Sequence, residues 1–275
     1  MKTACQDVLA GLIEGRLRAD AASIRSQWAH PDGTATRHFV VDGLLPDEIR
    51  HEIHAAFPRG GEGFFNRDSF RERKKTSANL DAYDAILTDI TYAFQDPRIV
   101  DLIAELIGFK GIEPDPKLYA GGLSMMFQGD FLNPHIDNSH DRERGRYRRL
   151  NLLYYVSPDW KVENGGNFEL WDEARSTPKT VAALTNRLVV METTRTSWHS
   201  VSPLVVEEPR CCVSNYYFSK NSPDATEYFH VTSFSGRPEE PFKRIVGVAD
   251  NALRNFVSKT LKVGRGKNRI NTSRR

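Results

Sequence analysis

The sequence contains few cysteines and no long hydrophobic run. Only Cys5, Cys211 and Cys212 occur among 275 residues, two of them adjacent and none at the spacing of a zinc site. This argues against a disulfide scaffold and is typical of a reducing compartment. No apolar run approaches the length of a membrane span, and Asp7 and Glu14 interrupt the N-terminal apolar stretch, unlike a signal peptide. We therefore expect a cytoplasmic protein without a membrane partner.

The sequence also lacks a strong net charge. Its 38 basic and 36 acidic residues give a formal charge of +2, which is too small to indicate a nucleic-acid partner. A hydrophobic content of 39% and a charged content of 27% are typical of a globular protein. The length permits one sizeable domain, and nothing in the composition indicates the oligomeric state.

The first part of the chain has the apolar spacing of helices. We predict helices at 4–18, after Leu45, at 81–95 and at 97–108, with a short strand at 38–41. Residues 59–79 are rich in glycine and then basic. We interpret this segment as a solvated loop; the alternative is a substrate-binding role for its basic cluster, Arg71, Arg73, Lys74 and Lys75.

From Leu118 onward, short runs rich in Val, Leu, Tyr and Phe alternate with turn residues. We predict strands at 118–127, 133–137, 149–156, 167–171, 187–192, 199–205, 210–219 and 226–232. A helix is predicted at 247–261, followed by a basic, disordered tail at 262–275. Helices first and strands later favour an α+β fold in a single domain over 1–261. Its helical part would be 1–117 and its β core 118–235.

His135 and Asp137 are two residues apart in the segment Asn-Pro-His-Ile-Asp. On an extended strand, residues i and i+2 point to the same face, so both side chains can reach one metal ion. His199 is the clearest candidate for a second histidine ligand, and Arg210 follows it by eleven positions. Two histidines and one carboxylate on one face of the metal are typical of non-haem Fe(II) oxygenases. His230 is a weaker competitor, because no arginine follows it at that spacing.

Five blocks in this order resemble the Fe(II)/2-oxoglutarate dioxygenases of the prolyl 4-hydroxylase type. They are Gly129–Asp137, Leu150–Val156, Asn164–Trp171, Asn186–Met191, and His199–Pro203 with Arg210. The resemblance implies a double-stranded β-helix, or jelly roll, with helices packed outside it. It also implies that His135, Asp137 and His199 bind Fe(II).

The resemblance further implies that Arg210 pairs with the distal carboxylate of 2-oxoglutarate, with Tyr155 adding a hydroxyl. A planar guanidinium suits this task, because it holds a carboxylate through two parallel hydrogen bonds. Relatives often have a tyrosine where this chain has Met126, so a hydroxyl contact is missing or supplied from elsewhere. Because the carboxylate ligand is present, halogenation is disfavoured.

The implied reaction is hydroxylation of an unactivated C–H bond, with O2 consumed, succinate and CO2 released, and ascorbate as reductant. Alternation from Arg210 predicts that Tyr216 lines the substrate site, and we place Asn133 and Arg146 there as well. Arg146 belongs to an arginine-rich segment, residues 142–149, that either attracts an anionic substrate or is a charged surface loop.

Three hypotheses remain for the function. The protein hydroxylates a prolyl residue of a polypeptide, or a small and possibly anionic metabolite, or it is a catalytically silent jelly-roll binding module. The complete ligand set with Arg210 argues against the third hypothesis. An open groove at the metal would favour a polypeptide, and a closed pocket lined by basic groups would favour a metabolite.

Overall fold

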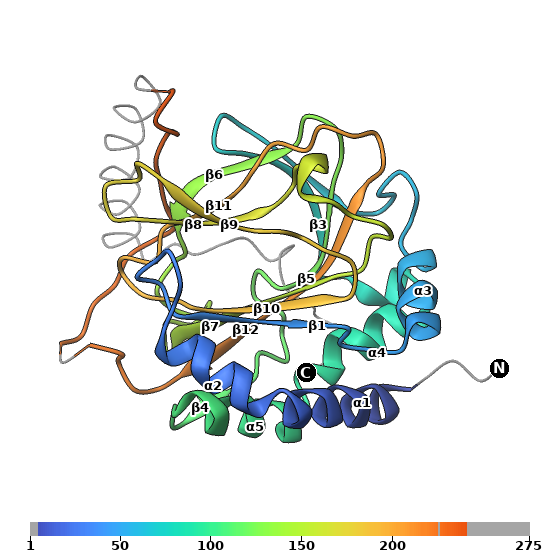
Figure 1. Cartoon of the computed structure of the whole chain (residues 1–275), viewed down its shortest axis with the longest axis horizontal. Helices are drawn as coiled ribbons and strands as arrows, with labels where there is room; N and C mark the ends of the chain where they lie inside the picture. Colours follow the sequence, from blue (N-terminus) through green and yellow to red (C-terminus); the bar gives the residue numbers. More distant parts are fainter. Residues whose placement is uncertain (1–4, 225, 241–275) are drawn as a thin grey trace.

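The computed structural model describes residues 5–224 and 226–240, and helices cover one face of its large antiparallel sheet (Figure 1). These helices are α1 (Gln6–Ala19), α2 (Ala21–Ala29), α4 (Ala85–Ala93) and α5 (Pro97–Ile107). A further helix, α3 (Asp47–Ala55), packs against α4. The predicted helices of the first part are confirmed, whereas α2 was not predicted.

Local sequence fixes where α5 begins and ends. The Asp96 side chain accepts a hydrogen bond from the backbone N–H of Arg98, and Pro97 occupies the first turn, where no partner for its nitrogen is needed. Gly108 ends the helix in the left-handed conformation, at φ 73°. The helix predicted at 97–108 therefore has the predicted ends.

The strands form one sheet that curls into two facing halves. In spatial order they are β1 (His38–Asp42), β10 (Arg187–Glu192), β7 (Tyr147–Tyr155), β12 (Arg210–Ser219), β5 (Gly122–Met126), β3 (Glu72–Ser77), β6 (Phe131–Ile136), β11 (His199–Val201), β8 (Phe168–Trp171) and β9 (Pro178–Val181). Three short strands pair beside this order: β2 (Phe65–Asp68) with β3, β4 (Ile112–Glu113) with β12, and β13 (Ser233–Phe234) with β6.

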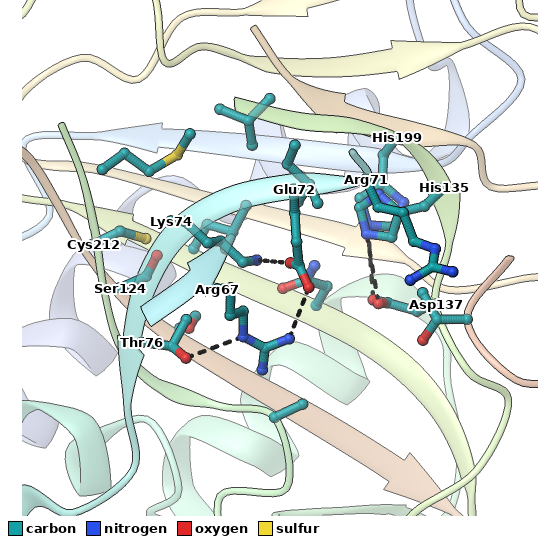
Figure 2. A pocket seen from close by; sticks show the side chains of 18 of the residues that line it. Arg67, Arg71, Glu72, Lys74, Thr76, Ser124, His135, Asp137, His199 and Cys212 are labelled. Atoms are coloured by element: carbon teal, nitrogen blue, oxygen red, sulfur yellow. Dashed lines mark hydrogen bonds and ion pairs between the residues drawn. The ribbon is translucent and has the colours of Figure 1, made fainter. Parts of the chain in front are cut away.

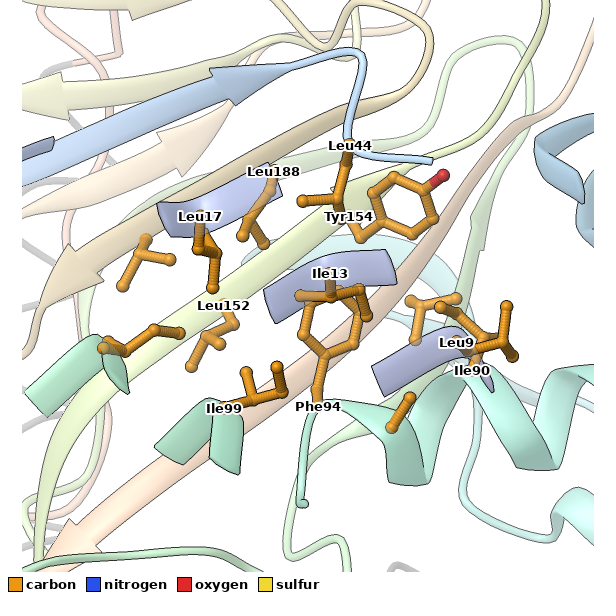
Figure 3. Close-up of a cluster of buried hydrophobic side chains, with 14 of the residues drawn as sticks. Leu9, Ile13, Leu17, Leu44, Ile90, Phe94, Ile99, Leu152, Tyr154 and Leu188 are labelled. Atoms are coloured by element: carbon orange, nitrogen blue, oxygen red, sulfur yellow. The ribbon is translucent and has the colours of Figure 1, made fainter. Parts of the chain in front are cut away.

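Strands β7, β10 and β12 are buried on both faces, which explains their nearly continuous apolar sequence. On β7, Leu152 and Tyr154 pack against the helices, while Leu153 and Tyr155 face the other way. Figure 3 shows the helical side of this arrangement, where Ile13 of α1 and Phe94, just after α4, lie over Leu152 and Tyr154. The helices thus close one side of the sheet and leave its second side to the interior.

The second side faces a smaller core inside the curled sheet. Its buried residues come from both halves, for example Val189 and Cys212 from one half and Phe168 and Leu170 from the other. Two antiparallel halves that share one interior, with helices packed outside, form the predicted jelly roll. The predicted fold class is confirmed as far as these residues; the helix predicted at 247–261 and the tail at 262–275 lie outside the described residues.

The interpretation of residues 59–79 as a solvated loop is wrong. Strands β2 and β3 form a hairpin there, and β3 lies between β5 and β6. The sheet therefore begins before residue 118, because β1 and β3 from the first part of the chain belong to it. The prediction failed since the strand Glu72–Ser77 is charged and shows no apolar alternation: it faces a polar cavity.

Two smaller differences concern the last strands. Residues 226–232 are not a strand; β13 begins just after them at Ser233. Strand β9, Pro178–Val181, was not predicted, because proline at its start and Lys179 and Thr180 within it weaken the apolar pattern. Within the described residues, we find no helix that is long and apolar enough to cross a membrane.

Candidate metal centre and cosubstrate cavity

His135, Asp137 and His199 converge inside the curled sheet, where β6 and β11 lie side by side. Residues His135 and His199 are direct partners in the antiparallel register of these strands, and their rings are 4.1 Å apart. Asp137 follows β6 by one residue. One ligand atom of each of the three side chains lies within 4.8 Å of the others, and all three residues are buried. Among the described residues, no other cluster of potential ligands of this kind occurs.

Both imidazoles present Nε2 to this centre. Nδ1 of His135 lies 3.0 Å from the carbonyl oxygen of Asn133, and Nδ1 of His199 lies 2.9 Å from that of Ser197. Each Nδ1 therefore carries the proton and donates it, which leaves a lone pair on Nε2. Nε2 of His135 is 3.8 Å from Asp137 Oδ1, and Nε2 of His199 is 3.7 Å from Asp137 Oδ2. These separations leave room for an ion between the ligand atoms.

Electrostatics favour the neutral imidazoles that a metal needs. Burial, together with the neighbouring His199, lowers the pKa of His135 to about 3. Burial also lowers the pKa of His199 below its usual value, although Asp137 acts in the opposite direction. Both rings are thus uncharged at neutral pH, and the single carboxylate provides the negative charge. This donor set fits a divalent cation that accepts nitrogen and oxygen ligands.

Arg148 holds the carboxylate of this centre. Its side chain is fully buried, and its Nη1 lies 3.2 Å from Asp137 Oδ2. The guanidinium carbon lies 3.9 Å from the ring centroid of Tyr216, and Nη2 donates to Asn138 Oδ1 at 3.0 Å. Because these contacts fix the guanidinium, Arg148 restrains the orientation of Asp137 and leaves Oδ1 on the side of His135.

We predict that Arg148→Met lowers the affinity of the site for Co(II) by about 10- to 100-fold, as expected for loss of a group that orients a ligand. The substitution also removes a positive charge near the metal, which by itself would raise the affinity for Co(II). A measured gain in Co(II) affinity would therefore contradict an orienting role for Arg148. Anaerobic Co(II) titration followed by absorbance measures the change. Arg146→Met is the matched control, because Arg146 instead binds Asp141 and Glu113; we expect its Co(II) affinity to equal that of the wild type.

Arg210 and Tyr155 lie in the wall of the same cavity as the metal centre. Arg210 is 4% exposed; its Nη1 donates to the carbonyl oxygen of Gly166 at 2.7 Å, while its Nε has no partner among the described residues. The hydroxyl of Tyr155 is also buried without a partner there, and burial raises the pKa of this tyrosine, which keeps its proton. An unsatisfied buried polar group costs roughly 1–3 kcal/mol, so this pair fits a bound carboxylate.

The Gly165–Gly166 turn allows this approach of Arg210. Gly166 adopts φ 64°, and a Cβ there would lie 3.1 Å from Arg210 Cδ. Gly165 adopts φ 73°, and a Cβ there would lie only 2.0 Å from the carbonyl oxygen of Pro203. Both residues must therefore be glycine. Gly165 avoids a collision with Pro203, and Gly166 leaves room for the side chain of Arg210.

We expect Gly165→Ala to lower the free energy of unfolding by roughly 3 kcal/mol, from backbone strain and the collision with Pro203. Chemical denaturation of the metal-free protein measures this loss. Gly43→Ala is the control: Gly43 has φ 60° but nothing within 4 Å of a Cβ, so it isolates the backbone effect, about 1 kcal/mol. Equal losses in the two variants would show that the collision is absent.

A cavity of about 460 Å³ connects the metal centre with Arg210, a volume typical of small-molecule sites. Tyr216, Cys212 and Ser214 of β12 line it, as alternation from Arg210 predicts. Met126 also lines the cavity, so a thioether lies where relatives often have a tyrosine hydroxyl.

Two residues predicted to line the substrate site lie elsewhere. Asn133 is buried and donates through Nδ2 to the carbonyl oxygen of Phe70. Arg146 points away from the cavity and lies in an outer crevice with Asp141.

Sequence reasoning missed Arg148 as a neighbour of the metal. Simple alternation along β7 from Tyr155 puts Arg149, not Arg148, on the cavity face. The register between β7 and β12 shifts at this point, where Tyr217 opposes Leu150 but Phe218 opposes Arg148. The extra residue turns Arg148 inward, and a bulge of this kind has no reliable signature in the sequence.

Comparison with known families agrees with this geometry. Residues 121–218 match the family model of the 2OG-Fe(II) oxygenase superfamily, a span that includes the candidate metal ligands, Tyr155 and Arg210. The match confirms the resemblance drawn from the five sequence blocks and the class of enzyme that it implies, a 2-oxoglutarate-dependent dioxygenase. The chain matches none of the curated protein sequences.

Solved structures show a similar fold. A prolyl-4-hydroxylase from Pseudomonas putida superposes with a TM-score of 0.52 and 16% identity, covering 74% of this chain and 100% of that one. A second match is a prolyl hydroxylase from Trichoplax adhaerens in complex with a peptide fragment of the hypoxia inducible factor oxygen degradation domain. It superposes with a TM-score of 0.51 and 15% identity, covering 75% of this chain and 93% of that one. A 2OG-Fe(II) oxygenase family oxidoreductase from Burkholderia pseudomallei superposes with a TM-score of 0.51 and 14% identity, covering 74% of this chain and 92% of that one. At these identities, the likeness is one of fold.

Proposed function

We propose that this chain, a 2-oxoglutarate-dependent dioxygenase by its sequence match, hydroxylates an unactivated C–H bond and releases succinate and CO2. His135, Asp137 and His199 would hold Fe(II), and Arg210 with Tyr155 would hold the distal carboxylate of 2-oxoglutarate. The observation that carries the proposal is one cavity that contains both a buried His–Asp–His cluster and two unpartnered buried donors. Either feature alone would fit other sites; together they fit a metal and a dicarboxylate.

When bound, the iron supplies the oxidising chemistry with O2 and 2-oxoglutarate, and the protein supplies binding and orientation. His135, Asp137 and His199 would supply three ligands to the metal and leave its other positions to groups that do not come from the protein. Arg148 keeps Asp137 in one orientation, and the neutral imidazoles stay fixed by the backbone carbonyls of Asn133 and Ser197. Leu153, Phe168 and Met126 add apolar side chains to the lining of the cavity.

Succinate release tests the proposal. Metal-free protein is supplied with Fe(II), 2-oxoglutarate, ascorbate as reductant and O2, and succinate is quantified with and without iron. We expect succinate to form only when iron is present, and candidate substrates are added in turn to the same assay. A protein that binds iron and 2-oxoglutarate but forms no succinate with any candidate substrate would instead be a silent binding module.

A prolyl residue is the second candidate substrate, favoured by the fold likeness to two prolyl hydroxylases. Adding proline-containing peptides to the same assay distinguishes this candidate from a small molecule. Stimulation of succinate release by such peptides, with formation of hydroxyproline, would support it.

A further inference from the structure

Apart from Arg210, the basic groups that face the cavity come from the β2–β3 hairpin and not from the arginine-rich segment 142–149. In that segment, Arg142 and Arg146 line the outer crevice, Arg144 lies over Phe229, Arg149 lies over Phe109, and Arg148 pairs with Asp137. The hairpin instead places Arg67, Arg71 and Lys74 in the cavity wall, and Figure 2 shows β3 crossing the front of the cavity. Any charge-based choice of substrate therefore depends on the hairpin.

Arg67, Glu72 and Lys74 form a linked set in this wall. Arg67 Nη1 lies 3.1 Å from Glu72 Oε1, and Lys74 Nζ lies 3.5 Å from Glu72 Oε2, so one carboxylate bridges two cations (Figure 2). The three side chains are only 11%, 17% and 20% exposed, respectively. Charged side chains are rarely buried to this extent on an ordinary surface, which indicates a built site.

Arg67 is held in place and still has a donor to offer. Its Nε donates to Thr76 Oγ1 at 3.2 Å, and its Nη1 binds Glu72. Its Nη2 makes no hydrogen bond to any described residue, and it belongs to a side chain that lines the cavity. A guanidinium fixed on one edge and open on the other is arranged to receive an anion.

The charge of the cavity also favours an anionic ligand. Four basic side chains line it, Arg67, Arg71, Lys74 and Arg210, against three acidic ones, Asp68, Glu72 and Asp137, which leaves +1 with neutral imidazoles, and the buried Arg148 beside Asp137 adds a further positive charge. A divalent metal and the 2-oxoglutarate dianion would cancel each other, so the loaded cavity keeps a positive excess. A negatively charged group on the substrate would offset it.

The cavity also offers neutral hydrogen-bonding groups. Ser124, Asn151 and Ser214 line it, and Asn151 Oδ1 is buried without a hydrogen-bond partner among the described residues. A buried amide end of this kind fits a polar group of the ligand. The cavity thus combines cations with neutral hydrogen-bonding groups.

We propose that Arg67 and Lys74 form an anion subsite that selects small polar substrates carrying a carboxylate or phosphate group, and that Glu72 occupies it until such a substrate displaces its carboxylate. The proposal rests on the proposed function, because it names the substrate class of that same cavity. It differs from the Arg210 site, which would be filled by 2-oxoglutarate.

Inorganic phosphate and acetate test the subsite without a known substrate. Each is titrated calorimetrically into protein loaded with Zn(II) and 2-oxoglutarate, so that Arg210 is already engaged. We expect Arg67→Met and Lys74→Met each to weaken binding of at least one anion about tenfold, and Glu72→Gln to tighten it about tenfold. Because a misfolded variant cannot gain affinity, the Glu72 variant keeps the test decisive. The tighter of the two anions indicates phosphate or carboxylate.

Lys75→Met is the matched control, since Lys75 is the next residue of β3 and its Nζ donates to the carbonyl oxygen of Gly60 outside the cavity. Equal anion affinity in the wild type and the Arg67, Lys74 and Glu72 variants would overturn the subsite, whatever the succinate assay shows. Absence of succinate with intact, Arg67-dependent anion binding would overturn the proposed function and leave the subsite standing. Stimulation of turnover by neutral prolyl peptides, but by no anionic metabolite, would overturn the proposed substrate class.

Discussion

Replacement of His199 by alanine is expected to lower iron-dependent succinate release by at least about 100-fold, because it removes one of the three proposed metal ligands. His199 is buried in β11, and its Nε2 lies 3.7 Å from Asp137 Oδ2. His135 and Asp137 alone would bind a divalent ion weakly. Co(II) titration of the same variant should therefore show a parallel loss of metal affinity.

His230→Ala is the control for this experiment, since His230 was the competing candidate in the sequence. Its ring stacks on Tyr228, and it is not part of the metal-ligand cluster. We expect metal affinity and succinate release close to wild-type values in this variant. Unchanged turnover in His199→Ala, or a loss confined to His230→Ala, would contradict the assignment of the metal centre. Far-ultraviolet circular dichroism of the metal-free variants checks that both still fold.

Arg210→Ala should raise the KM for 2-oxoglutarate by about 100-fold and leave Co(II) affinity within roughly threefold of the wild type. The estimate assumes loss of one or two charge-assisted hydrogen bonds, each worth roughly 1.5–3 kcal/mol, where 1.4 kcal/mol corresponds to a factor of ten. Tyr155→Phe removes one neutral hydroxyl, so we expect a smaller rise, about tenfold. Succinate formation as a function of 2-oxoglutarate concentration measures both effects.

The separation between cosubstrate and metal effects is what makes the Arg210 experiment specific. Arg98→Ala is the control, because Arg98 is an exposed arginine of α5 that pairs with Asp96 and Asp7 at the surface. A KM for 2-oxoglutarate that does not change in Arg210→Ala would contradict the carboxylate site. Joint loss of Co(II) binding would indicate that the substitution disturbs the fold of the β12 strand instead.

Several features of the site could be read from the sequence because they depend on local geometry. His135 and Asp137 are two residues apart and share one face of an extended segment, and Arg210 shares a face with Cys212, Ser214 and Tyr216 for the same reason. The ends of α5 also follow from residues next to the helix, Asp96 and Gly108. In each case, the physical cause acts over only a few residues of the chain.

Other features depend on contacts between distant segments. The inward position of Arg148 results from a register shift against β12, and the cavity role of Arg67 and Lys74 results from insertion of β3 between β5 and β6. Asn133 and Arg146 have suitable side chains close to the His135–Asp137 motif. However, Asn133 donates to the carbonyl oxygen of Phe70 and Arg146 pairs with Asp141, which directs both side chains away from the cavity. None of these partners is marked by spacing in the sequence.

The sequence by itself determined the α+β class and the three candidate metal ligands, because strand periodicity and side-chain chemistry suffice for these, and its resemblance to a known family indicated the arginine for the cosubstrate. Only the tertiary structure decided which basic residues face the cavity and which lie outside it. The physical reason is that the side-chain period of a strand is two, so one extra residue in the pairing exchanges its two faces. Charge at a cavity is set by that pairing, not by the number of arginines near a motif.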